Sequence, residues 1–464
     1  MDSLEKKTKL IICLFGESSH LKDFESFSTL IFCHNNHEIT QKIAAQCVFG
    51  GFAVNNSLFK TASPDFCYLD GKRMPKASRI GYSIAEDLGI NEKSLYKIDS
   101  IAESAIKNKV FPGCQVLFAR HGKIFYQKSF GYHTYDKKQK VKNSDIYDLA
   151  SVTKIAATTI SLMKLYDEEK NEEFDTEEFI DSLETERINL KADSLFGLFY
   201  AKEKTEEYQT KIAENFYFRT DLLDSIWEDV KEKCKIDTAK SYIYSDLNFY
   251  LLKRIVKEVS GSELGKYVYK NFYHSMGLKS MGYLPLKRFD KKRIVPTEKE
   301  VFFRQQLIHG YVHDPTAALM GGVGGHAGLF SNAEDLAILM QMLLNGGKYG
   351  TKQYISKKTV KKFTSKQENS ARGLGFNRKA SAGSSLIASS ASSSTFGHSG
   401  FTGICVWADP EIEIIYVFLS NRVHPKSNNQ KINQQKIRAK IHQVVYDAFL
   451  WNRFFLNILQ KQSF

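Results

Sequence analysis

The sequence predicts an α+β fold: an antiparallel sheet flanked by helices plus an all-helical subdomain, with a small α/β fragment at the amino end. Two observations support the sheet, because apolar and polar residues alternate around a turn signal in "CQVLFARHGKIFYQKSFGY" (114–132) and again in "GICVWADPEIEIIYVFLSN" (403–421). A third observation is that residues 152–280, between them, are mostly helical in pattern. Since the strands bracket the helices, we expect one sheet built from both ends of this unit.

Residues 1–70 form the predicted α/β fragment. The runs "KLIICLFG" and "STLIFCH" are typical of buried parallel strands, and "ITQKIAAQCVFGG" is typical of a helix that ends at Gly50 and Gly51. This piece is too short to complete a sheet, so we interpret it as the end of a larger domain. The polar stretch 71–84 contains glycine and proline and is the predicted linker.

Residues 85–450 form the second predicted domain, and residues 451–464 form a tail. Its expected elements, in order, are a helix over about 91–108, a hairpin turning at His121-Gly122, the helical middle, a hairpin turning at Asp409-Pro410, and a helix over about 432–450. The tract "SAGSSLIASSASSS" (381–394) has low complexity, which predicts a flexible surface loop.

The composition argues against several function classes. The 464 residues carry a net charge of +13, but the basic residues are scattered among acids without a groove-reading motif, so we expect no nucleic-acid partner. Seven widely spaced cysteines include no CxxC pair or cysteine–histidine cluster, so we expect no metal, no cofactor and no disulfide framework. The run "LIICLFG" is too short for a secretory signal or a membrane span, so no export signal is predicted and the localisation stays unassigned.

The first candidate for chemistry is Ser151 with Lys154, in "YDLASVTKIAATT". Residues three apart share a helix face, and a lysine among small apolar residues can lose its proton and activate a serine. The structural alternative is a helix cap with a lysine that reaches to solvent. Ser-x-x-Lys also occurs at Ser3, Ser19, Ser57, Ser94, Ser104 and Ser161. The copy at Ser151 differs from these because small residues surround both groups.

Two further motifs follow along the chain. Tyr244-Ser245-Asp246 precedes an apolar helix, so the phenol could act as base or acid, or the three residues could simply cap the helix. "FGHSGFTG" (396–403) precedes a strand, and its backbone N–H groups could supply half of an oxyanion hole, or it could be a glycine-rich turn.

The three motifs, in this order, resemble the penicillin-recognising serine hydrolases, and most closely the branch of class C beta-lactamases, D-aminopeptidases and esterases. The resemblance spans about residues 85–450, and the glycine-rich loop and helix of 321–350 strengthen it. It implies that Ser151 is acylated and that Lys154 and Tyr244 share proton transfer, with the identity of the base left open. It implies hydrogen bonding by Asp246 and a cationic or hydrogen-bonding role for His398. The site residues assigned in this way are Ser151, Lys154, Tyr244 and His398 as catalytic, the N–H groups of Ser151 and Phe401 as the oxyanion hole, and Asp246, Ser399 and Gly400 as substrate-binding.

The opening fragment resembles the last part of the C-terminal α/β domain of family-three glycoside hydrolases. The whole chain is similar to the back end of Bacteroidetes fusions of such a glycosidase with a penicillin-recognising domain, which act on cell-wall material in the periplasm or cell envelope. The glycosidase barrel is not part of this sequence, so we expect no glycosidase activity from this chain alone. Relatives usually carry a His-x-x-Gly-Leu motif after the nucleophile helix, whereas the corresponding stretch here, "INLKADSLFGLFYAKEK" (188–204), lacks a histidine.

We therefore predict a serine hydrolase that acts on amide or ester bonds of cell-wall peptides, D-amino-acid compounds, small esters or beta-lactams. One alternative is a module that binds peptidoglycan fragments without turning them over, which the altered stretch at 188–204 favours. A second alternative is an accessory part of a split beta-N-acetylhexosaminidase, with a separate barrel subunit as partner.

Overall fold

The computed structural model describes residues 10–51, 53–73, 79–168, 183–184, 199–222, 235–236, 245–368, 370–383 and 385–461. The chain divides into two units, Met1–Gly81 with Lys348–Lys352, and Tyr82–Gly347 with Gln353–Phe464. Among the described residues, no helix combines the length and the apolar character needed to cross a membrane.

The first unit is a small α/β piece. β1 (Ile12–Phe15) and β2 (Leu30–Cys33) pair in parallel, and the 3-10 segment η1 (Ser18–Phe24) lies between them in the chain. α2 (Glu38–Val48) follows and ends just before Gly50, which has φ +74°. The predicted parallel pairing is confirmed. Both strands are half-buried rather than buried, because a sheet of two strands buries little surface.

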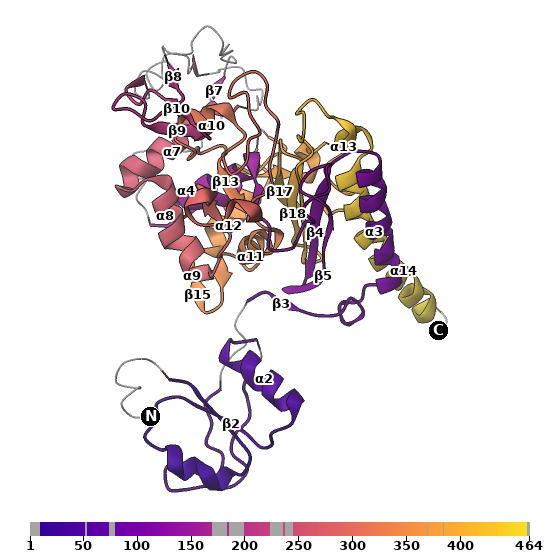
Figure 1. The fold of residues 1–464 in the computed structure, drawn as a ribbon. Coiled ribbons are helices and arrows are strands. Elements are labelled where there is room, and N and C mark those ends of the chain that lie inside the picture. Colours follow the sequence, from indigo (N-terminus) through magenta and orange to yellow (C-terminus); the bar gives the residue numbers. More distant parts are fainter. Residues whose placement is uncertain are drawn as a thin grey trace. The chain divides into compact units, whose positions relative to one another are not determined.

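The second unit is built on a seven-stranded sheet (Figure 1) with the strand order β16-β17-β18-β19-β4-β5-β3. The strands are β3 (Gly81–Tyr82), β4 (Gly113–Arg120), β5 (Lys123–Gly131), β16 (Asn377–Arg378), β17 (Phe396–Gly400), β18 (Ile404–Asp409) and β19 (Ile414–Ser420). His121 and Gly122 take φ values of +50° and +71°, which suits a two-residue hairpin turn. β19 pairs with β4, with Tyr416 opposite Phe118, so the two predicted hairpins share one sheet.

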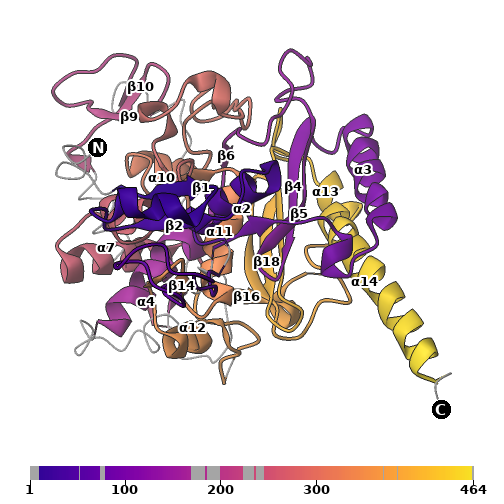
Figure 2. The same ribbon diagram turned by 90° about the horizontal axis from the view of Figure 1, so that it is seen from below.

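Helices cover both faces of this sheet. α3 (Glu92–Lys107) and α14 (Ile437–Lys461) lie together along one side, and α11 (Ala333–Leu344) lies on the other (Figures 1 and 2). The core under α3 and α14 includes Phe118 and Tyr416, whose rings stack at 4.6 Å. Such a buried aromatic pair adds about 0.5–1.5 kcal/mol beyond its area of burial.

The remainder of the unit is mainly helical and also carries short strands. The helices and helical turns are η2 (Glu86–Leu88), η3 (Ala150–Val152), η4 (Lys154–Thr159), α4 (Ile160–Asp167), α7 (Leu247–Ser260), α8 (Leu264–Val268), η5 (Tyr269–Tyr273), α9 (His274–Met276), η6 (Pro285–Lys287), η7 (Lys291–Arg293), α10 (Pro315–Leu319), α12 (Lys357–Thr364), η8 (Lys379–Ser381) and α13 (Lys431–Gln434). The strands are β6 (Tyr147–Asp148), β7 (Leu183–Glu184), β8 (Tyr200–Ala201), β9 (Thr210–Ala213), β10 (Phe216–Phe218), β11 (Lys235–Ile236), β12 (Gly282–Tyr283) and β13 (Leu329–Ser331). Lys348–Lys352, which belong to the first unit, contain β14 (Lys348–Tyr349) and the first residue of β15 (Lys352–Gln353). β12, β13 and β6 form a small sheet that ends two residues before the turn carrying Ser151.

Two local expectations are wrong in detail. The closing helix begins at Ile437 and continues to Lys461, beyond the expected end near residue 450. The serine tract is not a free surface loop, because Ile387, Ala388 and Ala391 are buried in the main core. The few apolar residues of the tract decide its position, which its overall composition does not reveal.

Candidate active site

Ser151 lies in a tight turn that leads from β6 into a helix. The chain passes through η3 and η4 into α4, and the Ser151 side chain is half-buried near the start of this path. Ala150, directly before it, has φ +44°, a conformation that costs free energy in a residue other than glycine. The turn is therefore strained where the predicted nucleophile is presented.

Lys154 points back toward this serine. Its Nζ lies 3.1 Å from Ser151 Oγ, so the two groups that the Ser-x-x-Lys spacing pairs are in hydrogen-bond contact. The lysine side chain is only 1% exposed, and its Nζ also lies 5.4 Å from the centre of the Phe249 ring. An ammonium group this buried needs a nearby opposite charge or hydrogen-bond acceptors.

Asp246 supplies that charge from the start of α7. Its Oδ1 accepts a hydrogen bond from Lys154 Nζ at 2.5 Å, and its side chain is 39% exposed. The Oγ of the neighbouring Ser245 accepts the backbone N–H of Leu247, the first residue of α7. Tyr244, the third member of this motif, lies outside the described residues.

His398 is buried in β17, near the same charges. Its Nδ1–H donates to the carbonyl oxygen of Ser399 at 2.7 Å. Burial lowers the pKa of His398 well below its usual value, and the charges of Lys154 and Arg372 lower it further. The side chain is therefore neutral at physiological pH, which fits hydrogen bonding and not the cationic option left open by the resemblance.

The end of β17 passes directly beside the nucleophile turn. A Cβ atom at Gly400 would come within 2.7 Å of the Leu149 carbonyl oxygen, so only a glycine allows this approach. Phe401 follows, with its ring 52% exposed and stacked on the ring of His313 at 5.6 Å. The structure thus brings the segments of Ser151 and Phe401 together, and Ser399, two residues before Phe401, is partly exposed.

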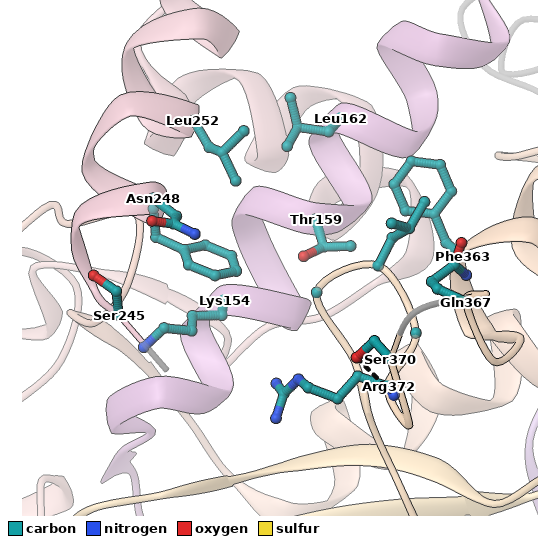
Figure 3. Close-up of a pocket in the computed structure, with 14 residues that line it drawn as sticks. Lys154, Thr159, Leu162, Ser245, Asn248, Leu252, Phe363, Gln367, Ser370 and Arg372 are labelled. Carbon is teal, nitrogen blue, oxygen red and sulfur yellow. Dashed lines mark hydrogen bonds between the residues drawn. The ribbon is translucent and has the colours of Figure 1, made fainter. Parts of the chain in front are cut away.

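A cleft opens from Lys154 between two helices and a loop (Figure 3). η4 contributes Lys154 and Thr159, α4 contributes Leu162, α7 contributes Asn248, and Arg372 projects from the loop after α12. The complete lining is Lys154, Thr159, Leu162, Ser245, Asn248, Phe249, Leu252, Phe363, Gln367, Ser370, Arg372, Gly373, Leu374 and Gly375. The cleft combines apolar side chains such as Leu162 and Leu252 with charged and polar groups near Lys154.

Sequence reasoning missed Asp148, His313 and Arg372. Asp148 is a single acid in the buried stretch "YDLAS". Because a buried carboxylate requires hydrogen-bond donors, its position indicates that several donors converge on it. Arg372 is followed by glycines in "ARGLGF", but short loops of this kind give no sequence indication of which cavity they line. Within the part of the chain that the structure describes, no group of three or more His, Cys, Asp or Glu side chains could hold a metal ion.

The amino-acid sequence matches a known protein family and named relatives. Residues 98–175 and 217–439 match the family model described as Beta-lactamase. The chain is 33% identical over 379 residues to a protein of Escherichia coli O157:H7 that is provisionally named a D-alanyl-D-alanine carboxypeptidase, and the match covers 75% of this chain and 87% of that protein.

Solved structures show the same fold at low identity. A penicillin-binding protein homologue from Caulobacter crescentus has a TM-score of 0.52 and 17% identity, and the match covers 77% of this chain and 98% of that one. A D-amino acid amidase from Ochrobactrum anthropi has a TM-score of 0.54 and 11% identity, with 78% and 100% of the chains covered. The predicted fold class is confirmed by these likenesses.

Proposed function

Because the chain belongs to the beta-lactamase family of serine hydrolases, we propose that Ser151 attacks the carbonyl carbon of a D-amino-acid peptide or amide and forms an acyl-enzyme that water then releases. The observation that carries this proposal is the contact chain Ser151 Oγ–Lys154 Nζ–Asp246 Oδ1, with distances of 3.1 and 2.5 Å. A serine hydroxyl is a weak nucleophile by itself, and a neighbouring group must take its proton as it attacks.

The ion pair with Asp246 favours the ammonium form of Lys154 in the resting protein. If Tyr244 is the base, its phenolate takes the Ser151 proton as the Oγ–carbon bond forms, while the Lys154 ammonium orients Oγ; if Lys154 is the base, its neutral amine takes that proton. The protonated base then gives the proton to the leaving amine as the carbon–nitrogen bond breaks. In deacylation the same base takes a proton from the attacking water and returns it to Ser151 Oγ. Tyr244 is assigned by resemblance to the same step. We assign the neutral His398, buried in β17, a hydrogen-bonding role.

The developing oxyanion requires two preorganised donors, which we assign to the backbone N–H groups of Ser151 and Phe401. The contact between Gly400 and the Leu149 carbonyl supports this assignment, because it brings the two segments within van der Waals distance.

Covalent labelling tests the proposal. Parent protein should be labelled by a fluorescent penicillin or a fluorophosphonate, and Ser151→Ala should not be labelled while keeping its circular-dichroism spectrum. Ser161→Ala is a matched control, since Ser161 and Lys164 repeat the Ser-x-x-Lys spacing on α4, where Ser161 Oγ instead donates to the Ala157 carbonyl. Equal labelling of parent and Ser151→Ala would refute the proposal.

A second candidate function is binding of peptidoglycan fragments without turnover. The histidine-free stretch 188–204 favours it, although residues 188–198 lie outside the described residues. Under this alternative, muropeptides bind parent and Ser151→Ala with equal affinity, and neither protein releases a product.

For the first unit we propose an origin in a family-three glycosidase domain. The parallel β1–β2 pair followed by α2 is compatible with this origin. The accessory function then predicts that the full chain co-purifies with a separate glycosidase barrel protein and that deletion of residues 1–70 abolishes this association.

A further inference from the structure

The two donors assigned to the oxyanion hole come from distant parts of the sequence, so their separation depends on contacts between those parts. One buried residue, Asp148, makes such contacts on both sides, with its side chain on one side and its backbone carbonyl on the other. Its Oδ1 accepts the backbone N–H of Ala150 at 2.8 Å, next to Ser151. Its backbone carbonyl accepts the Oγ1–H of Thr402 at 2.9 Å, next to Phe401.

The carboxylate also binds the residue that packs against the Phe401 ring. Asp148 Oδ2 accepts the backbone N–H of His313 at 2.6 Å, and the His313 ring stacks on Phe401. His313 is fixed further by its Nε2, which lies 2.8 Å from Glu298 Oε2. Asp148 therefore contacts Ala150, just before Ser151, and Thr402, just after Phe401. It also contacts His313, whose ring packs against Phe401.

The contact between Asp148 and Ala150 stabilises a strained backbone conformation. Ala150 has φ +44°, and a strained conformation of this kind persists when surrounding contacts over-determine it. The bond from Ala150 N–H to Asp148 Oδ1 is such a contact, because it closes the turn on itself immediately before Ser151.

We propose that Asp148 is a positioning residue that sets the distance between the Ser151 and Phe401 N–H groups, and so the strength of the oxyanion hole. This inference rests on the proposed function. Asp148 is 2% exposed, and each carboxylate oxygen already accepts a backbone N–H, so it is not placed to act as a base. Burial raises its pKa, and the two N–H bonds oppose that effect.

The first test replaces Asp148 by Asn, which keeps the shape but turns an NH₂ group toward one of the two N–H donors. The expected result is an acylation rate lower by about 10- to 100-fold, carried by kcat with KM little changed, because an oxyanion hole acts in the transition state. Asp335→Asn is the matched control. Asp335 is also a buried carboxylate that accepts two backbone N–H groups, those of Ser280 and Met281, at the start of α11.

A milder pair of variants covers the case in which Asp148→Asn does not fold. Thr402→Val removes the hydroxyl that binds the Asp148 carbonyl with almost no change of shape, and Thr402→Ser retains it. We expect Thr402→Val to lower kcat about tenfold and Thr402→Ser to restore it. Because Thr402→Val also removes a buried hydrogen bond, the rates are compared per folded molecule.

The outcomes separate the two proposals. If parent protein is not acylated at Ser151, the proposed function fails. If parent is acylated, and Asp148→Asn or Thr402→Val reacts at the parental rate per folded molecule, the positioning role is refuted. A loss in Asp148→Asn matched by the same loss in Asp335→Asn would also overturn it, since a general loss of stability would then explain both.

Discussion

Lys154 Nζ and Asp246 Oδ1 lie 2.5 Å apart, which joins the helical segment that carries the nucleophile to the start of α7. The lysine side chain is buried and the aspartate side chain is partly exposed, so only the aspartate contacts solvent to a substantial extent. A pair of this kind is intermediate between surface ion pairs, which contribute little, and buried pairs, which are costly to break. The Lys154–Asp246 pair therefore affects both the charge of the site and the free energy of unfolding of the protein.

Removing the charge of Asp246 should change the pH dependence of acylation. In Asp246→Asn the ammonium form of Lys154 loses its counter-charge, so its proton is released more easily and the acidic limb of the acylation-rate profile should move to lower pH. The free energy of unfolding should fall by about 1–3 kcal/mol, between the values for exposed and buried pairs. Labelling rates across pH and urea unfolding measure the two effects. Glu258→Gln, which breaks an exposed ion pair with Arg254 on the same helix, should change neither, and an unmoved limb in Asp246→Asn would contradict the prediction.

Arg372 should discriminate substrates by charge. Its guanidinium lines the cleft with Lys154 and acts electrostatically on His398, so a substrate carboxylate would be attracted to this side (Figure 3). For Arg372→Gln we expect KM to rise about tenfold for a D-alanyl peptide with a free carboxylate and to stay within about twofold for its C-terminal amide. Steady-state kinetics on the two substrates provide the measurement. An equal rise for both would assign Arg372 a structural role instead.

Gly400→Ala should separate β17 from the nucleophile turn. The added methyl group would meet the Leu149 carbonyl oxygen at 2.7 Å and Ile404 Cγ1 at 2.6 Å, and both belong to packed segments. We expect covalent labelling to slow by at least about tenfold while the folded spectrum is kept. Gly383→Ala is the control, since a Cβ there meets nothing within 4 Å. Labelling of Gly400→Ala at the parental rate would show that the two segments need not touch.

Stability should fall on acidification because of buried histidines. Burial lowers the pKa of His442 from 6.5 to about 3, so the unfolded chain binds the proton more readily than the folded one. The stabilisation is complete above pH 6.5 and is lost as the pH falls from there toward 3, which amounts to about 2 kcal/mol between pH 7 and pH 5. His442→Phe should remove this part of the pH slope in urea unfolding, whereas replacing the exposed His20 should not. An unchanged slope in His442→Phe would count against the assignment.

Much of the local structure could be predicted from sequence, because its causes act over short distances. The hairpin at His121-Gly122 and the helix that begins after Asn91, whose side chain caps it, follow from turn and cap chemistry. The Ser-x-x-Lys contact follows from helical spacing, and the order of three motifs predicted the fold class. Tyr244 lies outside the described residues, so its role stays a prediction.

The amino-acid sequence by itself determined which groups are available: a serine and a lysine three residues apart, an acid before a helix and a glycine-rich strand. The tertiary structure decided how they act. Long-range packing placed Asp246 against Lys154, buried His398 in a neutral state, brought Gly400 onto the nucleophile turn and gave Asp148 its two distant partners, His313 and Thr402. Charge states and approach distances depend on burial and on neighbours far along the chain, and these arise only when the whole sheet and its helices have closed around the site.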